Sequence, residues 1–317
     1  MAESPAPVAW VTAPVASVPA PVASVPATAA PADGSGPVVG AGPVAGLGLG
    51  LGWRPEIAGV VAALPGQRFT EVVTESLPAH GPLPAALAGL RERGVTVVPH
   101  GTRLSLGGTE PLEPRRVAGL AEAAERLGAP LVSEHIAFVR AGGTEAGHLL
   151  PLPRTGEALA VLTRNIADLQ STLGVPLAVE PIAALFDWPE DEYTEADFVT
   201  ELLERTGTWL LLDVANVYAN ARNRDLDPRT VLDRLPLERV AYLHVAGGAD
   251  HDGVYHDTHT APTPEPVLAL LRELSARLAA HQPAMLLERD GHYPPVAALR
   301  AELDAVARAA EIPEITR

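Results

Sequence analysis

Eight short apolar runs recur along this chain and alternate with longer segments of helical periodicity. Apolar runs of about four to eight residues are typical of strands that are buried on both faces, as parallel strands are. A repeated strand–helix alternation of this length favours an α/β fold of the (β/α)8 barrel type over an open doubly wound sheet. The predicted strands span residues 46–53, 69–75, 95–100, 130–135, 175–180, 208–213, 240–244 and 283–288.

Four of the intervening segments have the spacing of apolar residues that amphipathic helices show. One of them follows Thr194, a residue type that commonly caps a helix N-terminus. The glycine-rich stretch at 46–52 does not predict a dinucleotide site, because it lies inside a strand and has no acidic partner ~20 residues later. The predicted helices span 114–127, 156–173, 195–205 and 264–280.

Residues 1–43 differ from the rest of the chain in composition. They consist mostly of Pro, Ala, Val, Ser and Gly, and the heptapeptide PVASVPA at 14–20 is repeated at 21–27. Prolines at this density remove the backbone donors that helices and sheets need. We therefore expect a disordered tail at 1–43 and a catalytic domain at 44–317. The tail lacks the basic start and apolar core of a signal peptide, so we expect a cytoplasmic protein.

Side-chain chemistry and charge exclude several classes of function. The chain has no cysteine, and all 23 basic residues are arginine. Thiolate metal sites, disulfides, Schiff-base chemistry and a P-loop lysine are therefore excluded. The formal net charge of −16 opposes binding to nucleic acid or to an anionic membrane, and we expect neither partner.

Every predicted strand after the first ends in a side chain that can bind a metal ion. Burying a charged group is costly unless the group is paired or bound to metal. In a barrel, the carboxyl ends of the strands meet at one rim, where active sites lie. A helix cap or a surface ion pair explains any one such residue, but not seven in succession. The seven residues are Glu75, His100, His135, Glu180, Asp213, His244 and Glu288.

The segment after the seventh predicted strand adds His251, Asp252, His256, Asp257 and His259. Residues two apart in an extended segment face the same side, so we expect Asp257 and His259 to be able to bind one ion together. A solvated polar loop explains the other three equally well.

Imidazole and carboxylate ligands without sulfur suit zinc, iron or manganese. The ring and the loop supply more ligands than one ion needs, and Asn216 lies close to Asp213 in the sequence. Two or three ions that share a bridging carboxylate are therefore the simplest interpretation. These residue types alone leave both hydrolytic zinc and oxidative iron open.

The motifs around these residues resemble, in order and spacing, those of the multinuclear non-heme iron-dependent oxidases. This family was long one of unknown function and includes the oxidase of methanobactin biosynthesis. The resemblance covers about Gly46 to Ala310. The motifs are VPHG at 98–101, SEH at 133–135, LLPLP at 149–153, VEP at 179–181, LLDVANVY at 211–218, LHVAG at 243–247, DTH at 257–259 and LE at 287–288.

The resemblance implies a xylose-isomerase-like TIM barrel that holds two or three irons in a mixed-valent Fe(II)/Fe(III) state. It gives Glu75 no role as a ligand, which leaves that residue a structural one. The implied ligands are His100, His135 and Glu180 for the first iron; the bridging Glu180 with Asp213, His244 and Glu288 for the second; and Asn216, Asp257 and His259 for the third.

The resemblance also implies an enzyme with O2 as co-substrate and with no catalytic residue beyond the metal ligands. Its substrate would be a residue, often cysteine, of a ribosomally synthesised precursor peptide in natural-product biosynthesis, and a partner protein would bind the leader peptide. Two other functions stay open at this point. One is a metal-dependent hydrolase, phosphodiesterase or sugar isomerase on the same barrel, and the other is a non-catalytic module that binds partners.

Overall fold

The eight apolar runs form eight parallel strands in the computed structural model, which describes residues 41–79 and 81–317. Neighbouring strands follow the order β1-β12-β9-β8-β7-β4-β3-β2. The predicted strands are thus all present, to within a few residues at their ends. Their bounds are β1 Leu49–Leu51, β2 Phe69–Val73, β3 Thr96–His100, β4 Val132–His135, β7 Leu177–Glu180, β8 Trp209–Asp213, β9 Val240–Val245 and β12 Ala284–Leu287.

The sheet closes into a barrel between β1 and β2. Trp53, just beyond β1, forms a parallel bridge with Val72, and its N–H donates to Glu71 O at 2.7 Å. Gly50 permits this closure, because a Cβ at that position would lie 2.3 Å from Phe69 O. The prediction of a (β/α)8 barrel is therefore confirmed.

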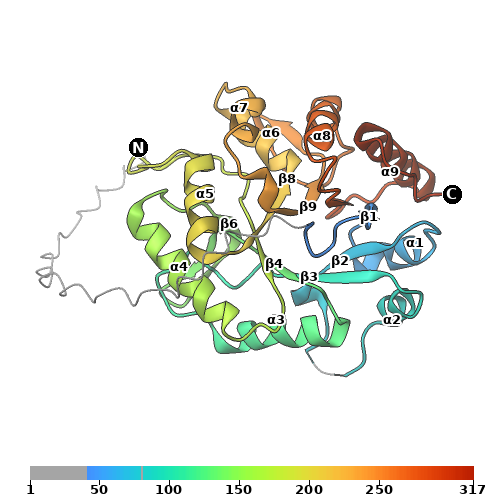
Figure 1. Ribbon diagram of the computed structural model, residues 1–317, viewed down its shortest axis with the longest axis horizontal. Coiled ribbons are helices and arrows are strands. Elements are labelled where there is room, and N and C mark those ends of the chain that lie inside the picture. Colours follow the sequence, from blue (N-terminus) through green and yellow to red (C-terminus); the bar gives the residue numbers. More distant parts are fainter. Residues whose placement is uncertain (1–40, 80) are drawn as a thin grey trace, which may run out of the picture. The chain divides into compact units, whose positions relative to one another are not determined.

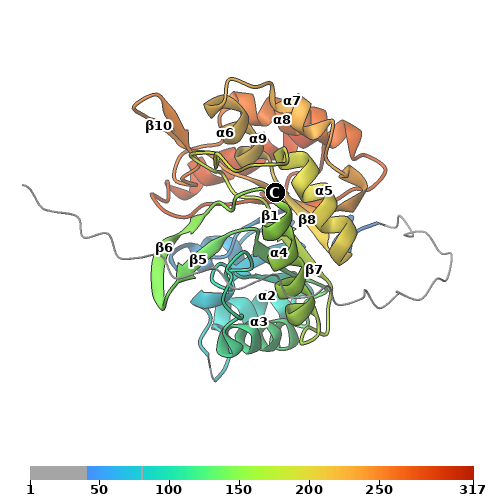
Figure 2. The ribbon, with the colours of Figure 1, turned by 90° about the vertical axis from the view of Figure 1, so that its left-hand side faces the viewer.

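Helices follow most of the barrel strands and lie around them in Figures 1 and 2. The predicted cap Thr194 accepts a hydrogen bond from Asp197 N–H at 3.3 Å, and Thr155 caps α4 in the same way. The helices are α1 Ala58–Ala62, α2 Ala85–Glu92, α3 Pro114–Leu127, α4 Gly156–Gln170, α5 Glu195–Thr206, α6 Val214–Asn223, α7 Pro228–Leu232, α8 Glu265–Arg277 and α9 Val296–Ala310, with 3-10 turns η1 Pro55–Ile57, η2 Thr74–Ser76 and η3 Leu237–Arg239.

Side chains along the barrel strands alternate between two apolar layers. Outward residues pack against the helices, whereas inward residues form a second cluster inside the barrel. The inward cluster includes Phe69, Val98, Ala178, Leu211 and Leu286. Each of these five stands two positions before an acidic residue or a histidine. Because side chains two apart share a face, those polar groups must also point into the barrel, one layer nearer the carboxyl rim.

Two antiparallel hairpins leave the barrel at this same rim. The first, β5 (Phe138–Ala141) with β6 (Thr144–Leu150), follows β4. The second, β10 (Ala249–His251) with β11 (Val254–His256), follows β9. Figure 2 shows both hairpins on one side of the barrel. They therefore stand next to whatever the rim residues bind.

The predicted tail lies almost wholly outside the described residues, which begin at 41. Residues 41–317 belong to one compact unit. The division into a tail at 1–43 and a catalytic domain at 44–317 stays a prediction. Among the helices of the described residues, none has both the length and the apolar character that crossing a bilayer requires.

Candidate metal centre

The inward positions at the carboxyl rim bring histidines and carboxylates from separate strands together. Four sets of three residues each have one potential ligand atom per residue within 4.8 Å of one another. The sets share members, so they form one continuous cluster. They are His100, His135 and Glu180; Glu180, Asp213 and His244; Asp213, His259 and Glu288; and Glu71, His244 and Glu288.

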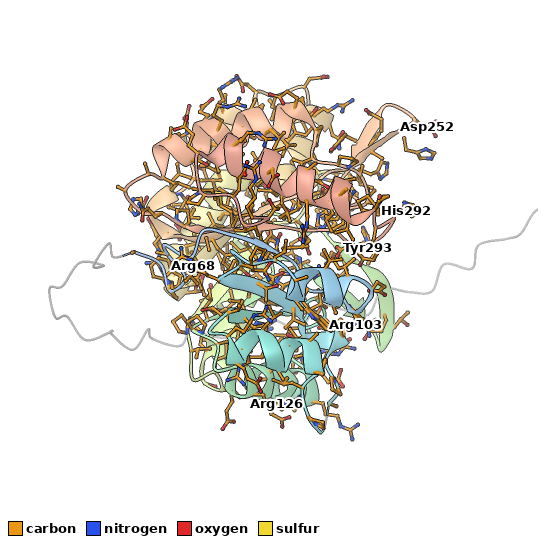
Figure 3. The ribbon with its side chains drawn as sticks, turned by 90° about the vertical axis from the view of Figure 1, so that its right-hand side faces the viewer. Arg68, Arg103, Arg126, Asp252, His292 and Tyr293 are labelled. Atoms are coloured by element: carbon orange, nitrogen blue, oxygen red, sulfur yellow. The ribbon has the colours of Figure 1, made fainter. Side chains whose placement is uncertain are left out.

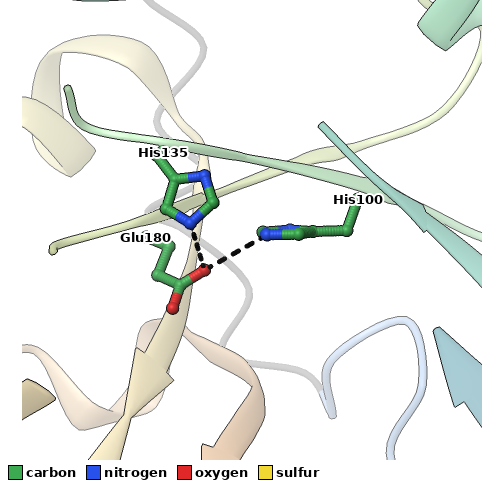
Figure 4. A group of neighbouring side chains, drawn as sticks. All are labelled: His100, His135 and Glu180. Atoms are coloured by element: carbon green, nitrogen blue, oxygen red, sulfur yellow. Dashed lines mark ion pairs between the residues drawn. The ribbon is translucent and has the colours of Figure 1, made fainter. Parts of the chain in front are cut away.

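Glu180, at the end of β7, faces two histidines with one carboxylate oxygen (Figure 4). His135 Nε2 lies 3.3 Å and His100 Nε2 lies 3.7 Å from Glu180 Oε2. His135 Nδ1 lies 3.2 Å from the backbone oxygen of Gly101. Since a carbonyl only accepts, Nδ1 carries a proton, which leaves Nε2 as the nitrogen of His135 that a cation beside Glu180 can bind.

The other oxygen of Glu180 faces a second group. His244 Nδ1 lies 3.5 Å from Glu180 Oε1 and 3.0 Å from Glu288 Oε2. Arg54 donates to Glu288 Oε1 at 2.6 Å and to Asp290 Oδ1 at 2.7 Å, which fixes the Glu288 carboxylate with Oε2 toward the histidine. The carboxylate of Glu180 thus stands between two imidazoles on one side and the imidazole of His244 on the other.

The two carboxylate oxygens of Asp213 make different contacts. Its Oδ1 accepts the backbone N–H groups of Ala215 at 2.6 Å and Asn216 at 3.2 Å, and so caps helix α6. Its Oδ2 points toward the cluster, 3.8 Å from His259 Nε2. The strand–helix junction therefore holds the carboxylate at the rim.

Asn216, Asp257 and His259 line one cavity of about 230 Å³ together with His100, His135, Glu180 and Glu288. His259 Nε2 lies 2.5 Å from Asp257 Oδ2, so the predicted pair does meet. The segment is not extended at this point, however, because His259 has φ = 53°. The amide nitrogen of Asn216 donates to Pro181 O at 3.1 Å. The carbonyl oxygen of Asn216 remains as its potential ligand atom.

Glu75 is the one member of the predicted ring that lies outside the cluster. Strand β2 ends at Val73, and Glu75 lies in η2, exposed, where its Oε1 accepts Thr102 N–H at 3.1 Å. The expectation that Glu75 ends the strand was therefore wrong by two residues. The carboxylate that β2 gives to the cluster is Glu71, which is fully buried.

Sequence reasoning missed Glu71, Arg54 and Asp290. Glu71 could have been found, because it stands two positions after Phe69 on the inward face of a predicted strand. Asp290 follows Glu288 by the same spacing. Arg54 had no sequence signal, since its partners lie more than two hundred positions away.

The three loop residues that a solvated loop explained equally well, His251, Asp252 and His256, stay apart from the cluster. His251 and Asp252 are exposed in the β10–β11 hairpin and pair with each other at 3.6 Å. Figure 3 shows Asp252 at the outer end of this hairpin. The ring of His256 stacks edge-on with His251, with 6.0 Å between ring centroids.

Three histidines of the cluster, His135, His244 and His259, have raised pKa values in the protein alone. Burial lowers the pKa of His135, but Glu180 and a hydrogen bond with Glu134 raise it to about 9. Burial also lowers the pKa values of His244 and His259, yet the surrounding carboxylates raise both well above the ordinary value. Positive charge in this place is therefore strongly stabilised.

The carboxylates show the complementary behaviour. Burial raises the pKa of Glu71, but His244 and His100 lower it to about 2. Attraction to histidines likewise outweighs burial and lowers the pKa values of Glu180 and Glu288. Asp213 differs, because burial and the nearby Asp257 raise its pKa to about 7. Negative charge on Asp213 is therefore disfavoured by burial and by the carboxylate of Asp257 beside it.

Several buried ligand atoms have no hydrogen-bond partner among the described residues. A buried polar atom without a partner costs about 1–3 kcal/mol, so a group of them needs an explanation. Nitrogen and oxygen atoms from imidazoles and carboxylates match the donor set of zinc, iron or manganese. The atoms are Glu180 Oε2, Asp213 Oδ2, His244 Nδ1 and Asp257 Oδ1.

The fold defines the class of protein: a xylose-isomerase-like (β/α)8 barrel. A barrel that matches it is endonuclease IV from Thermus thermophilus, with a TM-score of 0.55 and 22% identity over 81% of this chain and 98% of that one. A putative xylose isomerase from Rhodospirillum rubrum has a TM-score of 0.55 and 15% identity over 84% and 99%. At these identities the likeness concerns the fold alone.

The chain belongs to the MbnB/TglH/ChrH family of RiPP precursor modification enzymes, whose family model matches residues 48–311. This finding confirms the family that the motifs predicted. A UPF0276 protein of Streptomyces avermitilis is 53% identical over 84% of this chain, which spans 55% of that protein. A UPF0276 protein of Bordetella bronchiseptica is 42% identical over 81% of this chain and 91% of its own length.

Proposed function

We propose that this protein is a multinuclear non-heme iron-dependent oxidase that uses O2 to modify a residue, often cysteine in such enzymes, of a ribosomally synthesised precursor peptide. The observation that carries the proposal is the group of unpartnered ligand atoms from Glu180, Asp213 and His244, buried together at the rim. Membership of a family of precursor modification enzymes supports a peptide substrate. We assign the activity to residues 44–317.

Nine residues would hold two or three irons in a mixed-valent Fe(II)/Fe(III) state. Bound iron would supply O2 binding and the oxidising power for the peptide. The proposed ligands are His100, His135 and Glu180; Glu180, Asp213, His244 and Glu288; and Asn216, Asp257 and His259.

Glu180 is suited to a bridging role, because its two oxygens face different imidazoles. Oε2 lies 3.3 Å from His135 Nε2, and Oε1 lies 3.5 Å from His244 Nδ1. Other residues of the protein hold two further carboxylates in place. Arg54 donates a hydrogen bond to Glu288, and the backbone at the start of helix α6 donates to Asp213. Ligands held in this way need little rearrangement when an ion binds.

The cavity next to the cluster supports a substrate that enters as a single side chain. Its volume of about 230 Å³ suits one residue of an extended peptide, and His148 and Leu149 from the β5–β6 hairpin line it with Ile182 and Ala183. A partner protein that binds the leader peptide would deliver the substrate to this opening. A ribosomally made precursor would meet the enzyme in the cytoplasm.

The test begins with anaerobic purification, followed by iron and zinc analysis and Mössbauer spectroscopy. The protein is then incubated with O2 and short peptides encoded beside its gene, and peptide mass and O2 consumption are measured. The variant His135→Ala should lose both bound iron and turnover. The matched control is His251→Ala, which removes an exposed histidine on the hairpin and should retain both.

Two results would overturn the proposal. Stoichiometric zinc without iron, together with hydrolysis of phosphodiesters, would instead establish a hydrolase on this barrel. A wild-type protein that binds none of these metals tightly would establish a non-catalytic module.

A further inference from the structure

A chain of hydrogen bonds runs through the barrel interior next to the proposed ligands. His100 Nδ1 lies 2.8 Å from Ser133 Oγ, which lies 2.6 Å from Tyr242 Oη. Tyr242 Oη donates to Glu71 Oε2 at 2.6 Å, and His244 Nε2 lies 2.9 Å from the same oxygen. Strands β2, β3, β4 and β9 supply these residues, and all five are at most 2% exposed.

The carboxylate of Glu71, which both Tyr242 and His244 contact, fixes the direction of every bond in this chain. An ionised carboxylate has no proton to donate, so Tyr242 and His244 must both donate to Glu71. The single phenolic proton of Tyr242 is then used, and the hydroxyl of Ser133 must donate to Tyr242 Oη. Ser133 Oγ is left to accept from His100, which places a proton on His100 Nδ1.

This order leaves a different nitrogen free on each histidine. His100 has its lone pair on Nε2, which faces Glu180 Oε2 at 3.7 Å. His244 keeps its Nε2 proton on Glu71, so the nitrogen that a metal ion can bind is Nδ1, which lies 3.0 Å from Glu288 Oε2 and has no hydrogen-bond partner among the described residues. Imidazole binds metal through an unprotonated nitrogen, and the bond made by the other nitrogen selects which one is available.

We propose that Glu71 is a positioning residue that selects the metal-binding nitrogen of two histidines, directly for His244 and through Tyr242 and Ser133 for His100. The inference rests on the proposed metal centre and adds to it. It places Glu71 outside the ligand set, although its side chain lies near His244 and Glu288. The oxygen of Glu71 that faces His244 is occupied by two donors, so His244 turns its other nitrogen toward the cluster.

Three variants separate the two branches of this chain. Tyr242→Phe removes one oxygen atom and cuts only the His100 branch, because Ser133 can then turn its proton toward His100 Nδ1. Glu71→Gln preserves the volume but adds an N–H donor, so the order of protons is lost on both branches. Glu71→Ala removes the acceptor altogether and affects both branches more strongly.

Metal affinity measures these effects without any peptide substrate. The probe is Co²⁺, titrated against a competing chelator into full-length protein under anaerobic conditions. Tyr242→Phe should weaken binding of the Co²⁺ ion at His100 by about 10–100-fold and leave binding of the Co²⁺ ion at His244 unchanged. Both Glu71 variants should weaken binding of both Co²⁺ ions. The matched control is Phe69→Leu, which alters the edge-on packing against Tyr242 at 5.7 Å but none of the hydrogen bonds, and should leave both affinities unchanged.

A second measurement identifies the bound nitrogen. In ¹⁵N NMR of the Zn²⁺-loaded protein, His100 should bind through Nε2 and His244 through Nδ1. Binding of His244 through Nε2 would overturn the inference, as would wild-type affinities in Glu71→Gln or an equal loss in Phe69→Leu and Tyr242→Phe. If the wild-type protein binds neither Co²⁺ nor Zn²⁺, the proposed metal centre fails as well, which distinguishes the two failures.

Discussion

Arg54 donates to Glu288 at 2.6 Å, and the two residues lie 234 positions apart. Arg54 follows the first barrel strand and Glu288 follows the last, so this buried ion pair joins the two ends of the barrel sequence at its rim. Glu288 is also a proposed metal ligand. The pair therefore links the stability of the barrel to the geometry of the site.

Replacement of Arg54 by methionine should destabilise the protein. Removing one partner of a buried ion pair leaves an uncompensated charge and costs about 3–5 kcal/mol in the free energy of unfolding. Urea denaturation of the EDTA-treated protein measures the loss. The control is Arg205→Met, whose pair with Glu201 is exposed and should be worth less than about 1 kcal/mol. Equal effects of the two substitutions would contradict the importance of the buried pair.

Replacement of Asp213 by asparagine should separate folding from metal binding. Asparagine caps a helix as well as aspartate does, so the bonds to Ala215 and Asn216 can persist. The amide nitrogen that takes the place of Oδ2 cannot bind a cation. We expect an unfolding midpoint in urea equal to or above that of the wild type in EDTA, and a loss of bound metal by elemental analysis. A variant that binds a full complement of metal would show that Asp213 is not a ligand.

The stability of the EDTA-treated protein should fall as pH rises from about 6.5 to 9. Burial lowers the pKa of His135, but Glu180 and Glu134 raise it from 6.5 to about 9 in the folded protein. Because the pKa of His135 is higher in the folded than in the unfolded protein, its protonation contributes stability that is fully present below about pH 6.5. This stability is lost as the pH rises past about 9. Thermal unfolding at several pH values measures this slope. His135→Gln should flatten it, and an unchanged slope would contradict the assignment.

Replacement of Gly50 by alanine should open the junction between β1 and β2. The added Cβ would lie 2.3 Å from Phe69 O, so one strand must move. We expect this to lower the free energy of unfolding by about 1–3 kcal/mol or more. Gly59→Ala is the matched control, because a Cβ there meets nothing within 4 Å and alanine favours the α1 helix. Chemical denaturation compares the two. If Gly50→Ala is as stable as Gly59→Ala, the close approach of the strands does not determine closure.

Much of the fold and of the candidate site could be predicted from local patterns. Leu211 and Asp213 show why: a buried strand is visible as an apolar run, and a charged residue two positions after an inward apolar one must share its face. The same rule places His100 and Glu180. Their function as metal ligands stays a prediction.

Glu75 shows the limit of such patterns. The end of a strand predicted from sequence is uncertain by a few residues. Placing the end of β2 two residues too late therefore selected the exposed carboxylate of Glu75 instead of the inward carboxylate of Glu71. The predicted strand at 69–75 contains both Glu71 and Glu75, and only closure of the barrel decides that Glu71 is enclosed.

The sequence by itself determined the eight strands, the barrel class, the family and most of the residues at the rim, because these follow from periodicity and from motifs a few residues long. The tertiary structure decided which of them meet: the Arg54–Glu288 pair, the two-sided exposure of Glu180 and the chain from Glu71 to His100. These contacts join separate strands, and no local spacing encodes the distance between residues that only barrel closure brings together.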